Sequence, residues 1–98
     1  MKAAYLVAPG KIEVREVADP VCGPEEIVIR IDTALTCGTD LKAYRRGHPF
    51  IPMPGPFGHQ YSGTVEEVGE GVVGFAPGQP IAGVHSGPCQ TCPACRRG

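Results

Sequence analysis

The chain has 98 residues, which allows one small domain with a modest core. Its 9 Lys and Arg residues balance 10 Asp and Glu residues, so it lacks the basic excess typical of a nucleic-acid-binding protein. The 14 Gly and 11 Pro residues exclude a fold dominated by long helices and favour short strands joined by turns.

Membrane and secreted classes are also disfavoured by the sequence. The longest uncharged run, 71–95, is rich in Gly and Pro, which no bilayer-spanning helix tolerates. The apolar stretch before Pro9 is too short for a signal peptide. We therefore expect a cytoplasmic protein with no membrane partner. Three of its five cysteines are clustered, which in a reducing compartment indicates metal binding rather than disulfides.

Five stretches have the alternation or the β-branched content of strands. The first two are expected to form a hairpin closed by the turn Ala8-Pro9-Gly10, and the third, with its run of isoleucines, has the strongest strand pattern. The predicted strands are Lys2–Val7, Lys11–Val17, Glu26–Leu35, Tyr61–Val68 and Ile81–Val84.

Between the third and fourth strands the pattern changes. Thr39–Arg46 has helical spacing and an early acidic residue, so it predicts a helix of one or two turns. His48–Gly58 carries four prolines and predicts a stiff extended loop. The whole chain therefore predicts a mainly β fold: a small, partly open β-barrel with one short helix.

The segment near the end of the chain has the spacing of a metal site. Two residues separate Cys89 from Cys92, and two separate Cys92 from Cys95, so the chain can curl and bring the sulfurs onto one ion. Structural zinc takes four ligands, so a fourth would come from beyond Gly98. An iron–sulfur site, which needs a cysteine directly after Gly98, and three unrelated reduced cysteines are the alternatives.

Cys37 and His59 flank the proline-rich loop at the ends of two predicted strands. Such a pair can supply part of an open zinc site, which has three protein ligands and a free position. A buried cysteine and a surface histidine with no shared role are the simpler interpretation of each residue alone. Asp40 favours the metal interpretation, because metal-binding histidines usually donate their second N–H to a carboxylate or a carbonyl.

Several motifs in this order resemble the zinc-dependent medium-chain alcohol dehydrogenases, in particular the polyol and threonine dehydrogenase branch. They are Cys37-Gly38-Thr39-Asp40, Gly58-His59, Tyr61–Val72, Phe75-Ala76-Pro77-Gly78 and the cysteine triplet. The resemblance implies that residues 1–98 are an incomplete GroES-like N-terminal catalytic domain, with 86–98 as the start of a cysteine-rich structural-zinc lobe.

The resemblance also implies residue roles. Cys37 and His59 would bind a catalytic zinc ion, and the cysteine triplet (Cys89, Cys92 and Cys95) would supply three of the four ligands of a structural zinc ion. Thr39 would relay the substrate proton and Asp40 would orient His59. His48 would lie further along the relay, or else be a solvated loop histidine.

The implied reaction is the oxidation of a small alcohol or polyol, with hydride transfer to NAD(P). The full-length protein is expected to be a homo-oligomer. No nucleotide-binding Rossmann domain is evident: Gly69–Gly74 fits the glycine spacing of that fold but lacks a following helical pattern, so we interpret it as turns. NAD(P) would therefore bind through a domain that is absent here, and the 98-residue chain alone is expected to be inactive.

Two positions depart from the family pattern. Residue 60 is Gln where the family typically has Glu, and the neutral amide is expected to hold zinc less tightly. In Gly78-Gln79-Pro80-Ile81 the usual Asp and Arg are missing, which is expected to loosen the turn, whereas Pro80 is tolerable at a sheet edge.

The alternative from another functional class is a stand-alone, non-catalytic zinc-binding module. An iron–sulfur electron carrier is a third hypothesis. The zinc-free quinone reductases of the wider superfamily are disfavoured, because they lack the combination of Cys37, His59 and the cysteine triplet.

Overall fold

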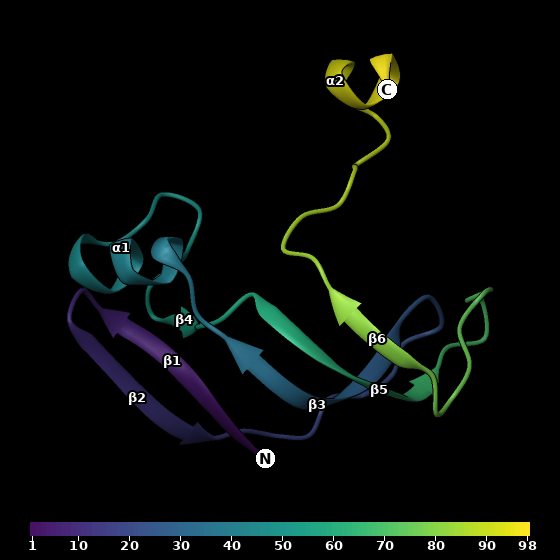
Figure 1. The fold of residues 1–98 in the computed structure, drawn as a ribbon, viewed down its shortest axis with the longest axis horizontal. Helices are drawn as coiled ribbons and strands as arrows, with labels where there is room; N and C mark the ends of the chain where they lie inside the picture. Colours follow the sequence, from purple (N-terminus) through teal and green to yellow (C-terminus); the bar gives the residue numbers. More distant parts are fainter.

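The computed structural model describes residues 1–98 and is built mainly of β-strands in two antiparallel, three-stranded sheets (Figure 1). Sheet A has the order β2 (Lys11–Glu16), β1 (Lys2–Ala8), β4 (Gly55–Pro56). Sheet B has the order β3 (Ile27–Leu35), β5 (Gln60–Val68), β6 (Pro80–Gly83). The two helices are α1 (Gly38–Arg46) and α2 (Pro93–Arg97). The sheets do not close, so the predicted mainly β, partly open architecture is confirmed.

The five predicted strands are all present, with ends that differ by one residue. In the β1–β2 hairpin Ala8 pairs with Lys11, and Gly10 takes a φ of 79°, which a glycine adopts without strain. The nine residues of α1 make it slightly longer than the one or two turns predicted.

Two short elements were not predicted. The proline-rich segment was expected to be loop throughout, but β4 lies within it and pairs with Tyr5 and Leu6 of β1. Proline removes a donor only at its own position, and the next residue, Phe57, donates its N–H to the Ala4 carbonyl (3.0 Å). The second is α2, which begins at Pro93, a residue suited to the first helical position.

The core is small. Leu6, Ala43 and Val65 are its fully buried apolar residues, whereas Ile31 and Leu35 on β3 are 50% and 65% exposed. The radius of gyration is 15.5 Å, above the roughly 13 Å of a compact domain of this length. After β6 the chain leaves the sheets, and α2 lies apart from both of them (Figure 1). Neither helix has the length and apolar character needed to cross a bilayer.

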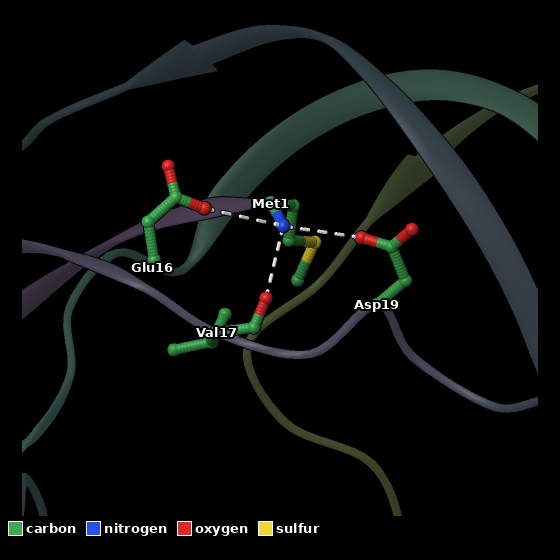
Figure 2. Close-up of polar contacts among 4 residues, drawn as sticks. All are labelled: Met1, Glu16, Val17 and Asp19. Carbon is green, nitrogen blue, oxygen red and sulfur yellow. Dashed lines mark hydrogen bonds and ion pairs between the residues drawn. The ribbon is translucent and has the colours of Figure 1, made fainter.

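The amino group of Met1 ties the start of β1 to the segment after β2 (Figure 2). It donates hydrogen bonds to the Val17 carbonyl (2.9 Å) and to Asp19 Oδ1 (3.2 Å), and it lies 3.7 Å from Glu16 Oε2. Val17 N–H donates in return to the Met1 carbonyl (2.8 Å). Because both carboxylates are exposed, the two backbone bonds carry most of this attachment.

The connection from β5 to β6 consists of turns. Gly69–Gly74 leads into no helix, in agreement with its interpretation as turns. A Cβ atom at Gly69 would collide with the Gly23 carbonyl oxygen, so this glycine allows close backbone packing. Further on, Gln79 Oε1 accepts a hydrogen bond from Ala76 N–H (3.1 Å), so a side chain still braces this turn, and its loosening by the missing Asp and Arg stays a prediction. Pro80 begins the edge strand β6, as predicted.

Candidate metal centres

The ends of β3 and β5 bring Cys37 and His59 together. Leu35 pairs with Gln60 at the end of the antiparallel β3–β5 ladder; Cys37 follows β3 as the N-cap of α1, and His59 precedes β5. Cys37 Sγ lies 3.4 Å from His59 Nε2, although the residues are 22 positions apart in the chain. The predicted proximity of the two side chains is present, and their role as metal ligands stays a prediction.

Asp40 contacts both members of this pair. Its carboxylate is 3% exposed. Oδ2 accepts a hydrogen bond from Cys37 N–H (2.8 Å), and Oδ1 lies 3.3 Å from His59 Nδ1, at ion-pair distance. That contact does not have the geometry of a hydrogen bond, so Oδ1 is a buried oxygen with no hydrogen-bond partner. A carboxylate beside Nδ1 favours a proton there, which leaves the Nε2 lone pair facing the Cys37 sulfur.

A cavity of about 580 Å³ opens beside the pair. Gln60 lies in its wall, and Gln60 Oε1 is buried without a hydrogen-bond partner. A thiol, an imidazole and an unpartnered amide oxygen therefore occur in one cavity, a donor set that fits zinc. The residues that line the cavity are Cys37, Thr39, His48, Phe50, Ile51, His59, Gln60 and His85.

Thr39 and His48, both predicted as catalytic residues, lie in the cavity wall. His48 is half-buried rather than fully solvated, and its Nδ1 accepts a hydrogen bond from Phe50 N–H (3.2 Å). A neutral His48 in this geometry carries its proton on Nε2 and is a hydrogen-bond donor through that nitrogen.

His85 was missed by sequence reasoning. Its ring stands edge-on to that of His59, with ring centroids 5.6 Å apart and an interplanar angle of 70°. It belongs to no spaced group of ligand residues, which is why motif analysis passed over it. The register of the β5–β6 pairing would have revealed it. Tyr61 pairs with Gly83 at the end of this antiparallel ladder, and His59 and His85 each lie two residues beyond that pair, on opposite strands.

The cysteine triplet converges as predicted. Its three sulfurs lie within 4.8 Å of one another, and Cys89 Sγ is 3.7 Å from Cys95 Sγ. Cys92 is the N-cap of α2, and its sulfur accepts a hydrogen bond from Cys95 N–H (3.4 Å). The helical turn that separates the last two cysteines is therefore what folds the sulfurs onto one side.

Hydrogen-bond donors surround the sulfur of Cys89. The Thr91 hydroxyl donates to its sulfur (3.6 Å), as does Cys92 N–H (3.3 Å). These donors, the Thr91 hydroxyl first, lower the pKa of Cys89 to about 6. The thiolate is the form that binds metals, and a thiol with this pKa is largely deprotonated at neutral pH.

Comparison with known proteins connects this geometry to a family. Residues 23–98 match the model of the alcohol dehydrogenase GroES-like domain, which covers both groups of candidate ligands. The chain belongs to the alcohol dehydrogenase GroES-like domain family.

Relatives match this GroES-like domain along nearly its whole length. The zinc-type alcohol dehydrogenase-like protein YdjL of Escherichia coli K12 is 37% identical over 98% of the chain, which covers 27% of YdjL. An acryloyl-coenzyme A reductase of Sulfurisphaera tokodaii is 36% identical over 100% of the chain and 30% of the reductase. Galactitol-1-phosphate dehydrogenase of Escherichia coli superimposes with a TM-score of 0.85 at 32% identity, covering 100% of the chain and 28% of that structure. The chain thus spans less than a third of the length of the proteins it matches.

Proposed function

We propose that this GroES-like domain is the N-terminal catalytic part of a zinc-dependent alcohol or polyol dehydrogenase. Such an enzyme oxidises an alcohol to a carbonyl compound and transfers a hydride to NAD(P), which would bind through a domain outside these 98 residues. The observation that carries the proposal is the Cys37–His59 pair, which lies beside the unpartnered Gln60 oxygen in one cavity. A homo-oligomeric assembly in the cytoplasm belongs to the same proposal.

The candidate ligands fall into two groups. Cys37 and His59 would hold the catalytic zinc ion, and the cysteine triplet would supply three ligands of a structural zinc ion in the lobe that begins at residue 86. Zinc, when bound, supplies Lewis acidity, which lowers the pKa of an alcohol hydroxyl.

The other residues of the cavity would position groups and move the proton. Asp40, at 3.3 Å from His59 Nδ1, would keep the Nε2 lone pair directed at the site. The Thr39 hydroxyl would accept the substrate proton and pass it on toward solvent. To continue the relay, His48 would take up the proton at Nδ1, in place of the hydrogen bond from Phe50 N–H, and release the proton on Nε2 toward solvent.

The full-length protein that carries this domain tests the proposal. We expect NAD(P)⁺ reduction with small alcohols or polyols, loss of activity on zinc removal and recovery on zinc addition. Cys37→Ser should lower both the zinc content and the activity. The matched control is Cys22→Ser, since Cys22 is another half-buried free cysteine, and its sulfur contacts only the Gly23 and Glu26 carbonyl oxygens. Unchanged zinc content and activity in Cys37→Ser would contradict the proposal.

The relative named for acryloyl-coenzyme A reduction calls for a comparison in the same assay, because that substrate is a thioester rather than an alcohol. NAD(P)H oxidation by the full-length protein with acryloyl-coenzyme A, without alcohol oxidation, would replace our proposal with that activity.

The convergence of the cysteine triplet favours one second candidate, a stand-alone zinc-binding module. Stoichiometric zinc on the purified 98-residue chain, lost in Cys92→Ser, would support the module. Weak zinc retention and no turnover by the same chain are the results expected of a dehydrogenase fragment.

A further inference from the structure

The cysteine triplet stands away from the two sheets. After β6 the chain leaves sheet B, and α2, which carries Cys95, lies apart from both sheets (Figure 1). Every residue from 84 to 91 is exposed, so the segment that leads into the triplet is open to solvent. A change in the chemistry of these sulfurs can therefore take place without breaking the strand pairing that brings Cys37 beside His59.

Cys89 and Cys95 hold their sulfurs near van der Waals contact, with the two Sγ atoms 3.7 Å apart. The chain between them turns back on itself at Gln90, whose φ of 64° is uncommon for a residue other than glycine. Cys92 lies between them in the chain, but its sulfur caps α2 and accepts the Cys95 N–H (3.4 Å). The folded backbone thus pairs the first sulfur of the triplet with the third.

The two sulfurs of this pair differ in their surroundings. Cys89 is exposed, whereas Cys95 is half-buried. The Cys89 sulfur accepts hydrogen bonds from the Thr91 hydroxyl (3.6 Å) and from Cys92 N–H (3.3 Å), and both donors stabilise negative charge on the sulfur. A small oxidant in solution therefore reaches Cys89 first, and Cys95 lies in position to attack the oxidised sulfur. An accessible cysteine beside a resolving cysteine is typical of reversible thiol oxidation.

We propose that Cys89 and Cys95 form an oxidation site that a hydroperoxide closes into a disulfide, with Cys92 left as a free thiol. The Cys89 sulfur attacks the hydroperoxide: an S–O bond forms, the O–O bond breaks, and the departing oxygen takes the Cys89 proton and leaves as an alcohol, or as water from hydrogen peroxide. The Cys95 sulfur then attacks the sulfenic sulfur: the S–S bond forms, the S–O bond breaks, and hydroxide leaves as water with the Cys95 proton. The two thiols are oxidised and the hydroperoxide is reduced.

The disulfide would remove two of the thiolates that the proposed structural zinc ion needs, because the thiolate is the form of cysteine that binds metals. Zinc would then leave the lobe that begins at residue 86, and reduction by a dithiol would restore the site. Cys37 should form no internal disulfide, since its group contains Asp40 and His59 but no second sulfur. The oxidation site does not depend on alcohol oxidation, so its failure and the failure of the dehydrogenase function are separate results.

The test treats the full-length protein with hydrogen peroxide and maps its disulfides by mass spectrometry without reduction. We expect a link between Cys89 and Cys95, a Cys92 that still reacts with an alkylating reagent, and full reversal by dithiothreitol. Cys22 is the internal control and should stay reduced, because it is a half-buried free cysteine whose sulfur contacts only carbonyl oxygens. A chromophoric zinc indicator in the same sample should report zinc release at the rate of disulfide formation.

Two variants separate the two chemical steps. In Cys95→Ser the second step has no thiol, so Cys89 should accumulate as a sulfenic acid that dimedone labels. In Cys92→Ser the link between Cys89 and Cys95 should still form, although the proposed zinc site has lost a ligand. In the wild-type protein, a link of Cys89 to any cysteine other than Cys95, or no disulfide in the triplet, would overturn the proposal.

Discussion

Leu35 pairs with Gln60 at the last rung of the β3–β5 ladder, and this single backbone pairing sets the distance between Cys37 and His59. The cysteine leaves one strand where the histidine enters the other. Metal binding at this pair would therefore be coupled to the integrity of sheet B, and changes in the sheet should affect the proposed zinc site from a distance.

Gly63 tests that coupling directly. A Cβ atom at Gly63 of β5 would collide with the Arg30 carbonyl oxygen of β3. We expect Gly63→Ala to destabilise the full-length protein by about 2 kcal/mol and to lower its zinc content, because the strands must separate to admit the methyl group. Urea unfolding and elemental analysis measure the two effects. Gly87→Ala, where a Cβ atom would meet nothing within 4 Å, should leave both unchanged; equal behaviour of the two variants would contradict the coupling.

Asp40 should control metal affinity without being a ligand. Asp40→Asn removes the charge beside His59 Nδ1 and keeps an oxygen that can accept the Cys37 N–H. We expect zinc affinity at the catalytic site to fall about 10- to 100-fold, as seen when partners of metal-binding histidines are changed. Competition with a chromophoric chelator measures it. Asp32→Asn, at an exposed carboxylate 3.6 Å from Arg30 Nε, is the control, and an unaltered affinity in Asp40→Asn would show that His59 needs no such partner.

Gln60→Glu should raise zinc occupancy. The variant places a carboxylate where the buried amide oxygen has no partner, so a cation would gain a charged donor. The metal-free variant should be less stable, because it buries an uncompensated charge. Zinc content by elemental analysis and thermal unfolding with and without zinc check both statements. Gln79→Glu, on the exposed β5–β6 turn, is the control, and equal zinc content in wild type and Gln60→Glu would refute the prediction.

The ionisation of Cys89 gives a pH prediction for the metal-free chain. Because hydrogen bonding lowers its pKa to about 6, the thiolate forms as the pH rises through about 6 rather than near the usual thiol value. Alkylation of Cys89 by iodoacetamide should therefore already be fast at pH 7 and should slow as the pH falls below 6. Thr91→Val removes the Thr91 hydroxyl that donates to the sulfur and should move the alkylation midpoint to higher pH. Mass spectrometry of the modified peptide measures the rates, and coincident profiles for the two proteins would contradict the role of Thr91.

Much of the fold could be predicted because its longer strands carry their own signal. β3 is β-branched and alternating, and the turn before β2 has the Pro-Gly pair that a tight hairpin uses. β4 could not be predicted, because its two residues have no periodicity and form a strand only through pairing with Tyr5 and Leu6. β4 is therefore formed by its contact with β1 rather than by its own sequence.

The candidate site, too, has residues with a signal in the sequence and one residue without it. The cysteine triplet was singled out by its spacing, and Cys37 and His59 by their places at strand ends together with the motifs of the resembled family. His85 was missed because its proximity to His59 depends on the β5–β6 register, and that register depends on the hydrogen bonds that Val65 exchanges with Gly78 and Gln79. Those bonds are visible only once the turn is folded.

The proposed function requires that Cys37 and His59 bind one zinc ion together. Anomalous X-ray diffraction at the zinc edge, from crystals of the full-length protein grown with zinc, tests it most directly. We expect an anomalous peak within bonding distance of both Cys37 Sγ and His59 Nε2, separate from any peak at the cysteine triplet. Zinc at the cysteine triplet, with no peak between Cys37 and His59, would contradict it.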